Sequence, residues 1–418
     1  MWFSDASVHD ITPDGAWTWF NDARALIIGH DRLLVGHVTC AGHIAATLYD
    51  HRSGRRQVTL LSHPADAEID DHNNPAFLAL PDGRILAAYA RHGTDRLMRW
   101  RYGTLSADEG GIDWSEERSL TVPADQCYSN LFNHAGNVVN ISRCINWNPT
   151  LFVSGDMGQS WSTPQALIKT GTGGTRPYAR FASNGQDRID ILYTDGHPRE
   201  TENSVYHAFF QGGRLYGTGG NPLSELPLKH DLGERGLKVL DGSAHPKGRL
   251  WILDVTSPKH NGQGLACIYQ LRKSAVAGKD WQGDRLWYFH ARWDGRTWRS
   301  RLIAQAGRPL YWKERDYAGG AALDPLDPLR LVISSNAADP FDFANMDLAE
   351  NNRYSLFDLR LTPEGDVSEW RKISRPADAL RPKLLPGRQG PASSALCWME
   401  GKYESYKAFQ TRIMGCFS

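Results

Sequence analysis

Two histidines, His72 and His92, stand on either side of a predicted hairpin. Residues 76–80 and 85–89 are apolar runs, and Asp82-Gly83 between them is a preferred hairpin turn. Folding about that turn pairs positions whose numbers sum to roughly 164 or 165, so both imidazoles emerge at the same open end. A neutral imidazole can accept a proton near neutral pH, so two of them could serve one substrate. The polar neighbours of His72 favour a solvated rim: Asp70, Asp71, Asn73 and Asn74.

The elements that must position these histidines are short strands. Apolar runs ended by Gly, Asp, Asn or Pro recur at 24–29, 33–38, 188–193 and 249–254, whereas long helical periodicity is hard to find. Such spacing is typical of an all-β chain built from many hairpins.

A repeat motif in the sequence indicates which all-β fold the chain adopts. Ser154–Trp161 fits S-x-D-x-G-x-x-W, the Asp-box turn of sialidase-like propellers, in which Asp and Ser tie down the turn and Trp fills the space between sheets. Weaker echoes lie at 293–298 and 363–370. Blades of about 60 residues predict a seven-bladed β-propeller of four-stranded antiparallel blades. We expect a single catalytic domain over residues 1–418, closed by a strand within 401–413.

Composition excludes several function classes. The chain has 418 residues, 41% hydrophobic and 22% charged, with a formal net charge of zero. Balanced charge predicts neither a nucleic-acid nor a membrane partner, and we expect a monomer. No apolar stretch approaches the roughly 20 residues that span a bilayer. The first residues lack signal-peptide features, so the chain is expected to be cytoplasmic, or secreted or periplasmic with its leader removed. The six cysteines form no C-x-x-C pair, so no zinc ribbon or redox motif is readable.

Several segments together resemble the BNR-type (Asp-box-related) seven-bladed polysaccharide lyases, the group of ulvan lyases and rhamnosyl-glucuronate lyases. The segments that carry this resemblance are Gly15–Asp22, Asp71–Pro75, Arg91–His92, Cys127–Asn130, Arg143, Arg176–Tyr178 and Thr194–Glu200. The resemblance implies that His72 and His92 are the paired active-site histidines. It also implies that Tyr128 and Arg143 face each other across the next hairpin, and that Tyr178 is a further active-site tyrosine.

The substrate implied by this resemblance is an acidic polysaccharide or oligosaccharide that contains rhamnose and glucuronate. β-Elimination removes the C5 proton of the uronate, expels the oxygen at C4 and leaves a 4,5-unsaturated product. Arg143, aided by His72 and Tyr178, would neutralise the uronate carboxylate and the charge that develops beside it. We assign His92 as base and Tyr128 as acid. The converse, or Tyr128 in both roles, fits the same sequence.

Other residues are expected to support the site. Candidates for contacting the sugar are Trp17, Trp19, Asn21, Asn73, Arg91, Arg176 and Arg199. The chemistry requires no cofactor. His197 and His207 could contribute to a structural metal ion, zinc or calcium, but two ligands do not complete a tetrahedral site. Buried, hydrogen-bonded histidines are the alternative.

Two other functions remain open on the sequence. A sialidase-like glycoside hydrolase shares the Asp box but needs catalytic carboxylates or a Tyr-Glu nucleophile, with arginines around the substrate carboxylate. A non-catalytic propeller could use the same polar residues to bind sugars. The sequence also leaves open whether the substrate is cut internally or at its end, and whether sulfate is recognised.

Overall fold

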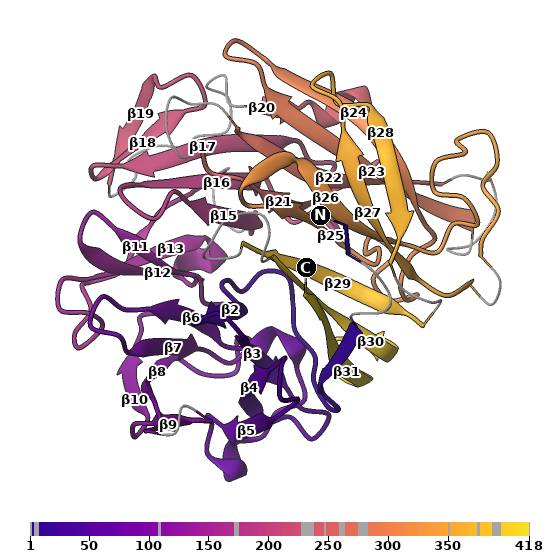
Figure 1. Ribbon diagram of the computed structural model, residues 1–418. Helices are drawn as coiled ribbons and strands as arrows, with labels where there is room; N and C mark the ends of the chain where they lie inside the picture. The colour runs from indigo at the N-terminus through magenta and orange to yellow at the C-terminus, as the bar shows by residue number, and fades with distance from the viewer. Residues whose placement is uncertain are drawn as a thin grey trace.

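The computed structural model describes residues 2–3, 8–107, 110–170, 175–226, 238–245, 248–258, 264–274, 283–349, 352–373, 377–386 and 394–417. Within these residues the strands form seven antiparallel sheets, and Figure 1 shows them arranged in a ring. The predicted seven-bladed β-propeller is therefore confirmed. The described residues contain no helix with the length and apolar character needed to cross a membrane.

The first three blades follow the chain from their innermost strand outward. Blade 1 consists of β2 (Ala25–Ile28), β3 (Arg32–Val38), β4 (Ile44–Asp50) and β5 (Arg56–Leu60). Blade 2 consists of β6 (Ala76–Ala79), β7 (Ile85–Tyr89), β8 (Leu97–Leu105) and β10 (Arg118–Thr121), with β9 (Ile112–Trp114) added against β8. Blade 3 consists of β11 (Leu131–His134), β12 (Asn137–Arg143), β13 (Pro149–Ser154) and β14 (Gln165–Ala166).

The next three blades keep this order. Blade 4 consists of β15 (Ala179–Ser183), β16 (Arg188–Thr194), β17 (Val205–Gln211), β18 (Arg214–Gly217) and β19 (Pro222–Glu225), with β20 (Lys238–Leu240) against β17. Blade 5 consists of β21 (Arg249–Val255), β22 (Ala266–Ser274), β23 (Asp284–Trp293) and β24 (Trp298–Gly307). Blade 6 consists of β25 (Ala321–Asp324), β26 (Asp327–Ser335), β27 (Ser355–Leu361) and β28 (Val367–Lys372).

Blade 7 joins the two ends of the chain. The C-terminal part supplies β29 (Ala379–Leu385), β30 (Ala395–Ser405) and β31 (Ala408–Phe417), and β1 (Val8–Thr12) pairs with β31. In Figure 1 the indigo β1 lies beside the yellow strands of this blade. The predicted closing strand is thus a hairpin, and β1 covers its outer edge. Pairing the two ends hides a sheet edge that would otherwise be open.

Apolar side chains between neighbouring blades form the core. Leu86 of blade 2 and Phe152 of blade 3, for example, belong to one buried cluster. The Asp box has the predicted structural role, because the Ser154 hydroxyl donates to Asp156 Oδ1 over 2.7 Å and Trp161 packs edge-on against Trp100 of blade 2.

The two candidate catalytic histidines lie on the same face of the ring. Because neighbouring strands run antiparallel, the innermost strand of a blade begins at the same face where its second strand ends. In blade 2 the register pairs Ala76 with Ala88 and Ala79 with Ile85, so facing positions sum to 164 as predicted. His72 precedes β6 and His92 follows β7, and both therefore reach that face.

Candidate active site

A polar cavity of about 130 Å³ opens on this face. Its lining comes from blades 2, 3, 4 and 7 and from the segment that leads into blade 6. The lining residues are His72, His92, Arg143, Trp147, Arg176, Tyr178, His197, Arg199, Glu314, Tyr317 and Tyr406.

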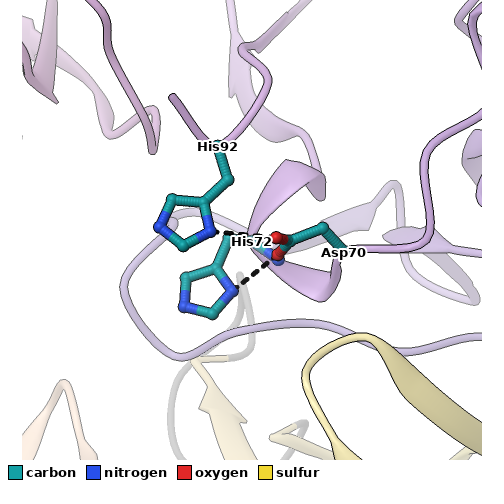
Figure 2. A group of neighbouring side chains, drawn as sticks. All are labelled: Asp70, His72 and His92. Carbon is teal, nitrogen blue, oxygen red and sulfur yellow. Dashed lines mark hydrogen bonds and ion pairs between the residues drawn. The ribbon is translucent and has the colours of Figure 1, made fainter. Parts of the chain in front are cut away.

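A single carboxylate, Asp70, orients both histidines. Its Oδ1 lies 2.8 Å from Nδ1 of His72, and its Oδ2 lies 2.9 Å from Nδ1 of His92. The two rings stack with centroids 4.2 Å apart and planes 12° from parallel. Figure 2 shows both rings on the same side of Asp70, each with its second nitrogen directed away from the carboxylate. The Nδ1 atoms are thus occupied, and the Nε2 atoms are left for a ligand.

The shared carboxylate leaves the two imidazoles in different protonation states. Burial lowers the pKa of His72, but the carboxylates of Asp70 and Asp71 outweigh it and raise the pKa to about 10. Burial and the charge on His72 lower the pKa of His92 below its usual 6.5, despite its bond to Asp70. Although burial opposes ionisation of Asp70, the two imidazoles hold its pKa far below the usual range. At neutral pH the site therefore presents one imidazolium and one neutral imidazole.

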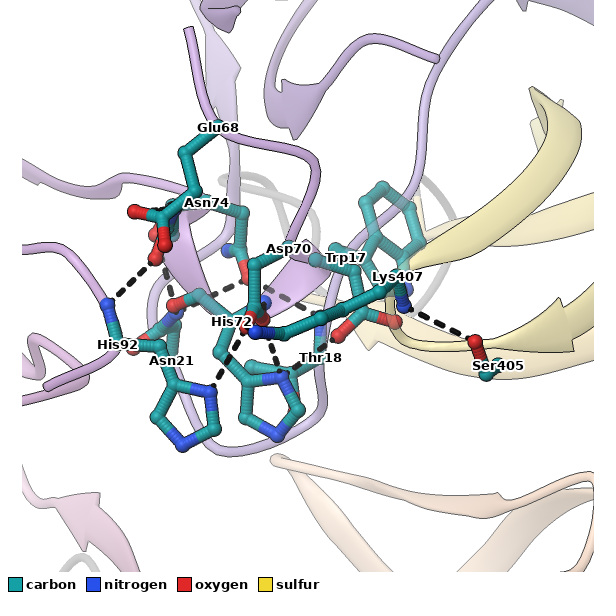
Figure 3. Close-up of polar contacts among 12 residues, drawn as sticks. Trp17, Thr18, Asn21, Glu68, Asp70, His72, Asn74, His92, Ser405 and Lys407 are labelled. Carbon is teal, nitrogen blue, oxygen red and sulfur yellow. Dashed lines mark hydrogen bonds and ion pairs between the residues drawn. The ribbon is translucent and has the colours of Figure 1, made fainter. Parts of the chain in front are cut away.

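Asn21 and its neighbours hold the loop that carries His72. The Asn21 amide donates to the carbonyl oxygens of His72 and Asn74 over 2.9 and 3.0 Å, and the backbone N–H of His92 donates to Asn73 Oδ1 over 2.7 Å. Figure 3 shows Asn21 and Asn74 beside His72. Asp71 is bound by the buried guanidinium of Arg381 over 2.6 Å. These hydrogen bonds hold the backbone of the loop that carries His72 and the backbone of His92 in place.

Arg143 carries the positive charge that a substrate carboxylate could reach. Its Nε donates to the carbonyl of Trp147 and its Nη2 to the carbonyl of Arg176, each over 2.9 Å, and its guanidinium lies 4.3 Å from the ring centroid of Tyr178. Burial lowers the pKa of Arg143, but Tyr178 and Cys127 outweigh it and raise the pKa. No carboxylate pairs with Arg143 among the described residues. Arg176, by contrast, is paired with Glu200.

Tyr128 lies beneath the histidine pair. Its ring stacks on His72 at 5.6 Å and on His92 at 6.3 Å, and its backbone has a φ of 68°, which tyrosine rarely adopts. Within the described structure its buried hydroxyl has no hydrogen-bond partner. Burial and the neighbouring Tyr178 raise the pKa of Tyr128 well above its usual value, so the phenol is protonated at neutral pH.

The structure adds residues that sequence reasoning missed. Glu314 and Tyr317 come from the segment between β24 and β25, and Tyr406 comes from the turn between β30 and β31. Glu314 pairs with Arg199, while burial raises the pKa of its carboxyl. The ring of Tyr406 meets that of His72 edge-on at 5.0 Å. No motif marks these positions, because they join the site through the closure of the ring.

The residues predicted to contact sugar fall into two groups. Arg176 and Arg199 line the cavity, whereas the others do not. Trp17 is fully buried and donates to the Arg381 carbonyl over 3.1 Å, and the buried Trp19 packs edge-on beneath Tyr317 at 4.9 Å. Arg91 lies near Asp66, Glu68 and Asp95. Trp17, Trp19, Asn21, Asn73 and Arg91 therefore lie outside the set of residues that line the cavity.

The two histidines considered as metal ligands do not fit a metal site. His207 uses both ring nitrogens, with Nδ1 3.0 Å from Thr218 Oγ1 and Nε2 3.1 Å from Asp190 Oδ1. His197 instead lines the cavity and packs edge-on against Tyr178. Among the described residues, neither belongs to a group of three possible metal ligands. Burial, with Arg143 and Arg199 nearby, lowers the pKa of His197 to about 3, so it is neutral.

Three solved structures of carbohydrate-active enzymes are similar to this chain to different degrees. The solved structure of a polysaccharide lyase, a PL25 ulvan lyase bound to -[GlcA(1-4)Rha3S]-, has a TM-score of 0.68 and 14% identity, over 99% of this chain and 94% of that one. A second PL25 ulvan lyase structure gives the same values. The GH93 α-L-arabinofuranosidase of Fusarium graminearum with arabinobiose has a TM-score of 0.44 and 15% identity, over 82% and 91%.

The structural likeness to the two ulvan lyase structures shows a shared fold. No curated protein matches the chain by sequence. The sequence pattern of the BNR repeat-containing family matches residues 32–306, which is more than half of the chain. The chain therefore belongs to the BNR repeat-containing family.

Proposed function

We propose that the protein is a polysaccharide lyase that cleaves the α-L-rhamnosyl-(1→4)-D-glucuronate linkage by β-elimination. The observation that carries this proposal is the histidine pair on Asp70, in which one imidazole is charged and the other neutral. β-Elimination beside a carboxylate needs both a cation to neutralise that carboxylate and a neutral base.

The uronate carboxylate is assigned to Arg143 and protonated His72. Arg143 has no carboxylate partner among the described residues, and both side chains line the cavity. Charge-assisted hydrogen bonds from both groups would stabilise the enolate-like charge that develops as the C5 proton leaves. Such preorganised donors are typically worth about 3 kcal/mol each in the transition state.

The proton transfers are assigned to His92 and Tyr128. Nε2 of His92 takes the proton from C5, the electron pair forms the C4–C5 double bond, and the C4–O bond breaks. Tyr128 is not among the residues that line the cavity, and its hydroxyl is buried, protonated and without a partner in the described structure. We assign it the proton that goes to the departing rhamnose oxygen, which requires the bound substrate to reach below the lining. The pKa of His92 is lowered and that of Tyr128 is raised, so at neutral pH the imidazole is free to accept a proton and the phenol still has one to donate. This difference supports the assignment over the reverse. No water is consumed, and the unsaturated glucuronate keeps the double bond.

The experiment is to incubate the protein separately with ulvan, gum arabic and the disaccharide rhamnosyl-(1→4)-glucuronate. Absorbance is followed at about 235 nm, where a conjugated uronate absorbs. We expect a rise with at least one substrate. His92→Ala and Tyr128→Phe should each reduce the rate by about 10²- to 10⁴-fold. No rise on any substrate would reject the lyase, and near-wild-type rates in either variant would reject that residue's role.

A specific observation favours one other function, a sialidase-like glycoside hydrolase. Glu314 and Tyr317 line the same cavity as three arginines, and a Tyr-Glu pair with arginines around a carboxylate is what that chemistry uses. Arg176 and Arg199, however, are already paired with Glu200 and Glu314. New reducing ends without the absorbance rise would identify the hydrolase.

A further inference from the structure

An exposed tryptophan, Trp312, lies two residues before Glu314 of the cavity lining. Trp312 is 61% exposed, more than any other large hydrophobic residue in the described part of the chain. Aromatic rings left in water beside a sugar site are poorly explained by packing, because burial would stabilise them. Their apolar faces match the C–H faces of a pyranose ring.

The local backbone places Trp312 at the rim of the cavity. Tyr311 and Glu314 form an antiparallel bridge, with the Glu314 N–H donating to the Tyr311 carbonyl over 3.2 Å. Trp312 and Lys313 therefore occupy the tip of a tight turn. Both flanking residues point inward, since Glu314 lines the cavity and the Tyr311 ring packs against Tyr317, which also lines it. The exposed tip thus belongs to the wall that Glu314 forms.

A positive charge accompanies the indole. The Lys313 Nζ lies 5.3 Å from the Trp312 ring centroid, and no carboxylate pairs with Lys313 within the described residues. The turn therefore offers an apolar platform and an unneutralised ammonium together. A sugar ring that carries an anionic substituent complements both features.

We propose that Trp312 and Lys313 form an additional subsite for an anionic sugar of the substrate chain, outside the linkage that is cleaved. This inference rests on the proposed lyase function and assigns the enzyme an acidic polymer as its substrate. Trp312 and Lys313 are not among the residues that line the cavity, so this subsite would bind a sugar outside it. The disaccharide rhamnosyl-(1→4)-glucuronate has a single anionic sugar, the one at the cleaved linkage, so it lacks the further anionic sugar that the subsite would bind.

The test compares Trp312→Ala on ulvan and on rhamnosyl-(1→4)-glucuronate. Because the indole is exposed, the variant should fold like the wild type. We expect KM for ulvan to rise about tenfold relative to any change on the disaccharide, with kcat little affected. Lys313→Gln should raise KM for ulvan less and make it less sensitive to salt. Equal changes on both substrates, or none on ulvan, would overturn the subsite.

Matched controls lie in β28. Trp370 is 46% exposed, Lys372 is also exposed, and neither lines the cavity. Trp370→Ala and Lys372→Gln should leave KM for ulvan unchanged, and a rise equal to that of Trp312→Ala would indicate nonspecific adhesion and reject the subsite.

Electrophoresis through gels that contain ulvan separates this inference from the lyase function. If the wild-type protein cleaves none of the substrates, the lyase function fails. Retardation of the wild type but not of Trp312→Ala would still support the subsite, whereas equal mobility of the two proteins in the gel would overturn it.

Discussion

The two walls of the cavity use their carboxylates in opposite ways. Behind the histidine wall, formed by His72, His92 and Arg143, Asp70 is shared by two imidazoles and stays ionised although it is buried. In the glutamate wall, formed by Arg199, Glu314 and Tyr317, one carboxylate pairs with one arginine, and burial raises its pKa. The first arrangement keeps an excess cation beside a neutral base, and the second neutralises its own charge. The comparison predicts that chemistry resides in the histidine wall.

Replacing the shared carboxylate should have the largest effect. In Asp70→Asn, an NH2 group that only donates replaces one of the two carboxylate oxygens, so one Nδ1–H loses its acceptor. That ring loses its orientation, and His72 loses the negative charge that favours its protonation. We expect kcat to fall by about 10³- to 10⁴-fold, as when the orienting aspartate of a catalytic histidine is removed. Absorbance assays on ulvan would measure this loss, with circular dichroism to verify folding.

Asp66→Asn is the matched control for that substitution. Asp66 is half-exposed, and within the described residues Arg91 is the only cationic residue that forms an ion pair with it. Its rate should stay near that of the wild type. An Asp70→Asn enzyme within tenfold of wild type would show that the shared carboxylate is not what prepares the histidines.

The pH profile should show the unequal protonation of the pair. As pH falls through the lowered pKa of His92, the base becomes protonated and kcat/KM should drop about tenfold per pH unit, on the acid side of 6.5. As pH rises through about 10, His72 loses the proton that helps to hold the substrate carboxylate, and KM should rise. Rates measured across this range for wild type and His72→Gln would test both limbs.

The same pair also gives a stability prediction with a defined sign. Because the pKa of His72 is raised by folding, its contribution to stability is complete below about 6.5 and is lost as pH rises through about 10. The melting temperature of His72→Gln should therefore decline less over that pH interval than the melting temperature of the wild type.

For the pH profile of activity, an acid limb above neutral pH would contradict the assignment of His92 as the neutral member of the pair.

Sequence reasoning reached the two histidines of the histidine wall because they are local, whereas Arg143, at the end of β12 in the next blade, was reached only through the family resemblance. His72 and His92 flank one hairpin, and an Asp-Gly turn fixes its register. The role of Asp70 could not be predicted from the sequence, since its spacing does not reveal that one carboxylate binds both imidazole rings. Glu314 joins the site only when the ring closes. Residue type alone also misplaced Trp17, because an indole serves a buried core as readily as a sugar site.

The smallest expected effect comes from the glutamate wall. Glu314→Gln keeps the shape of the side chain and removes only its charge, and Arg199 is half-exposed, so water can replace the lost partner. For a lyase, the rate on ulvan should change by less than about fivefold. For a hydrolase that uses Glu314 with Tyr317, the same change should abolish turnover. Tyr317→Phe serves as the companion variant, and large losses in both, measured as reducing ends, would move the chemistry from the histidine wall to the glutamate wall.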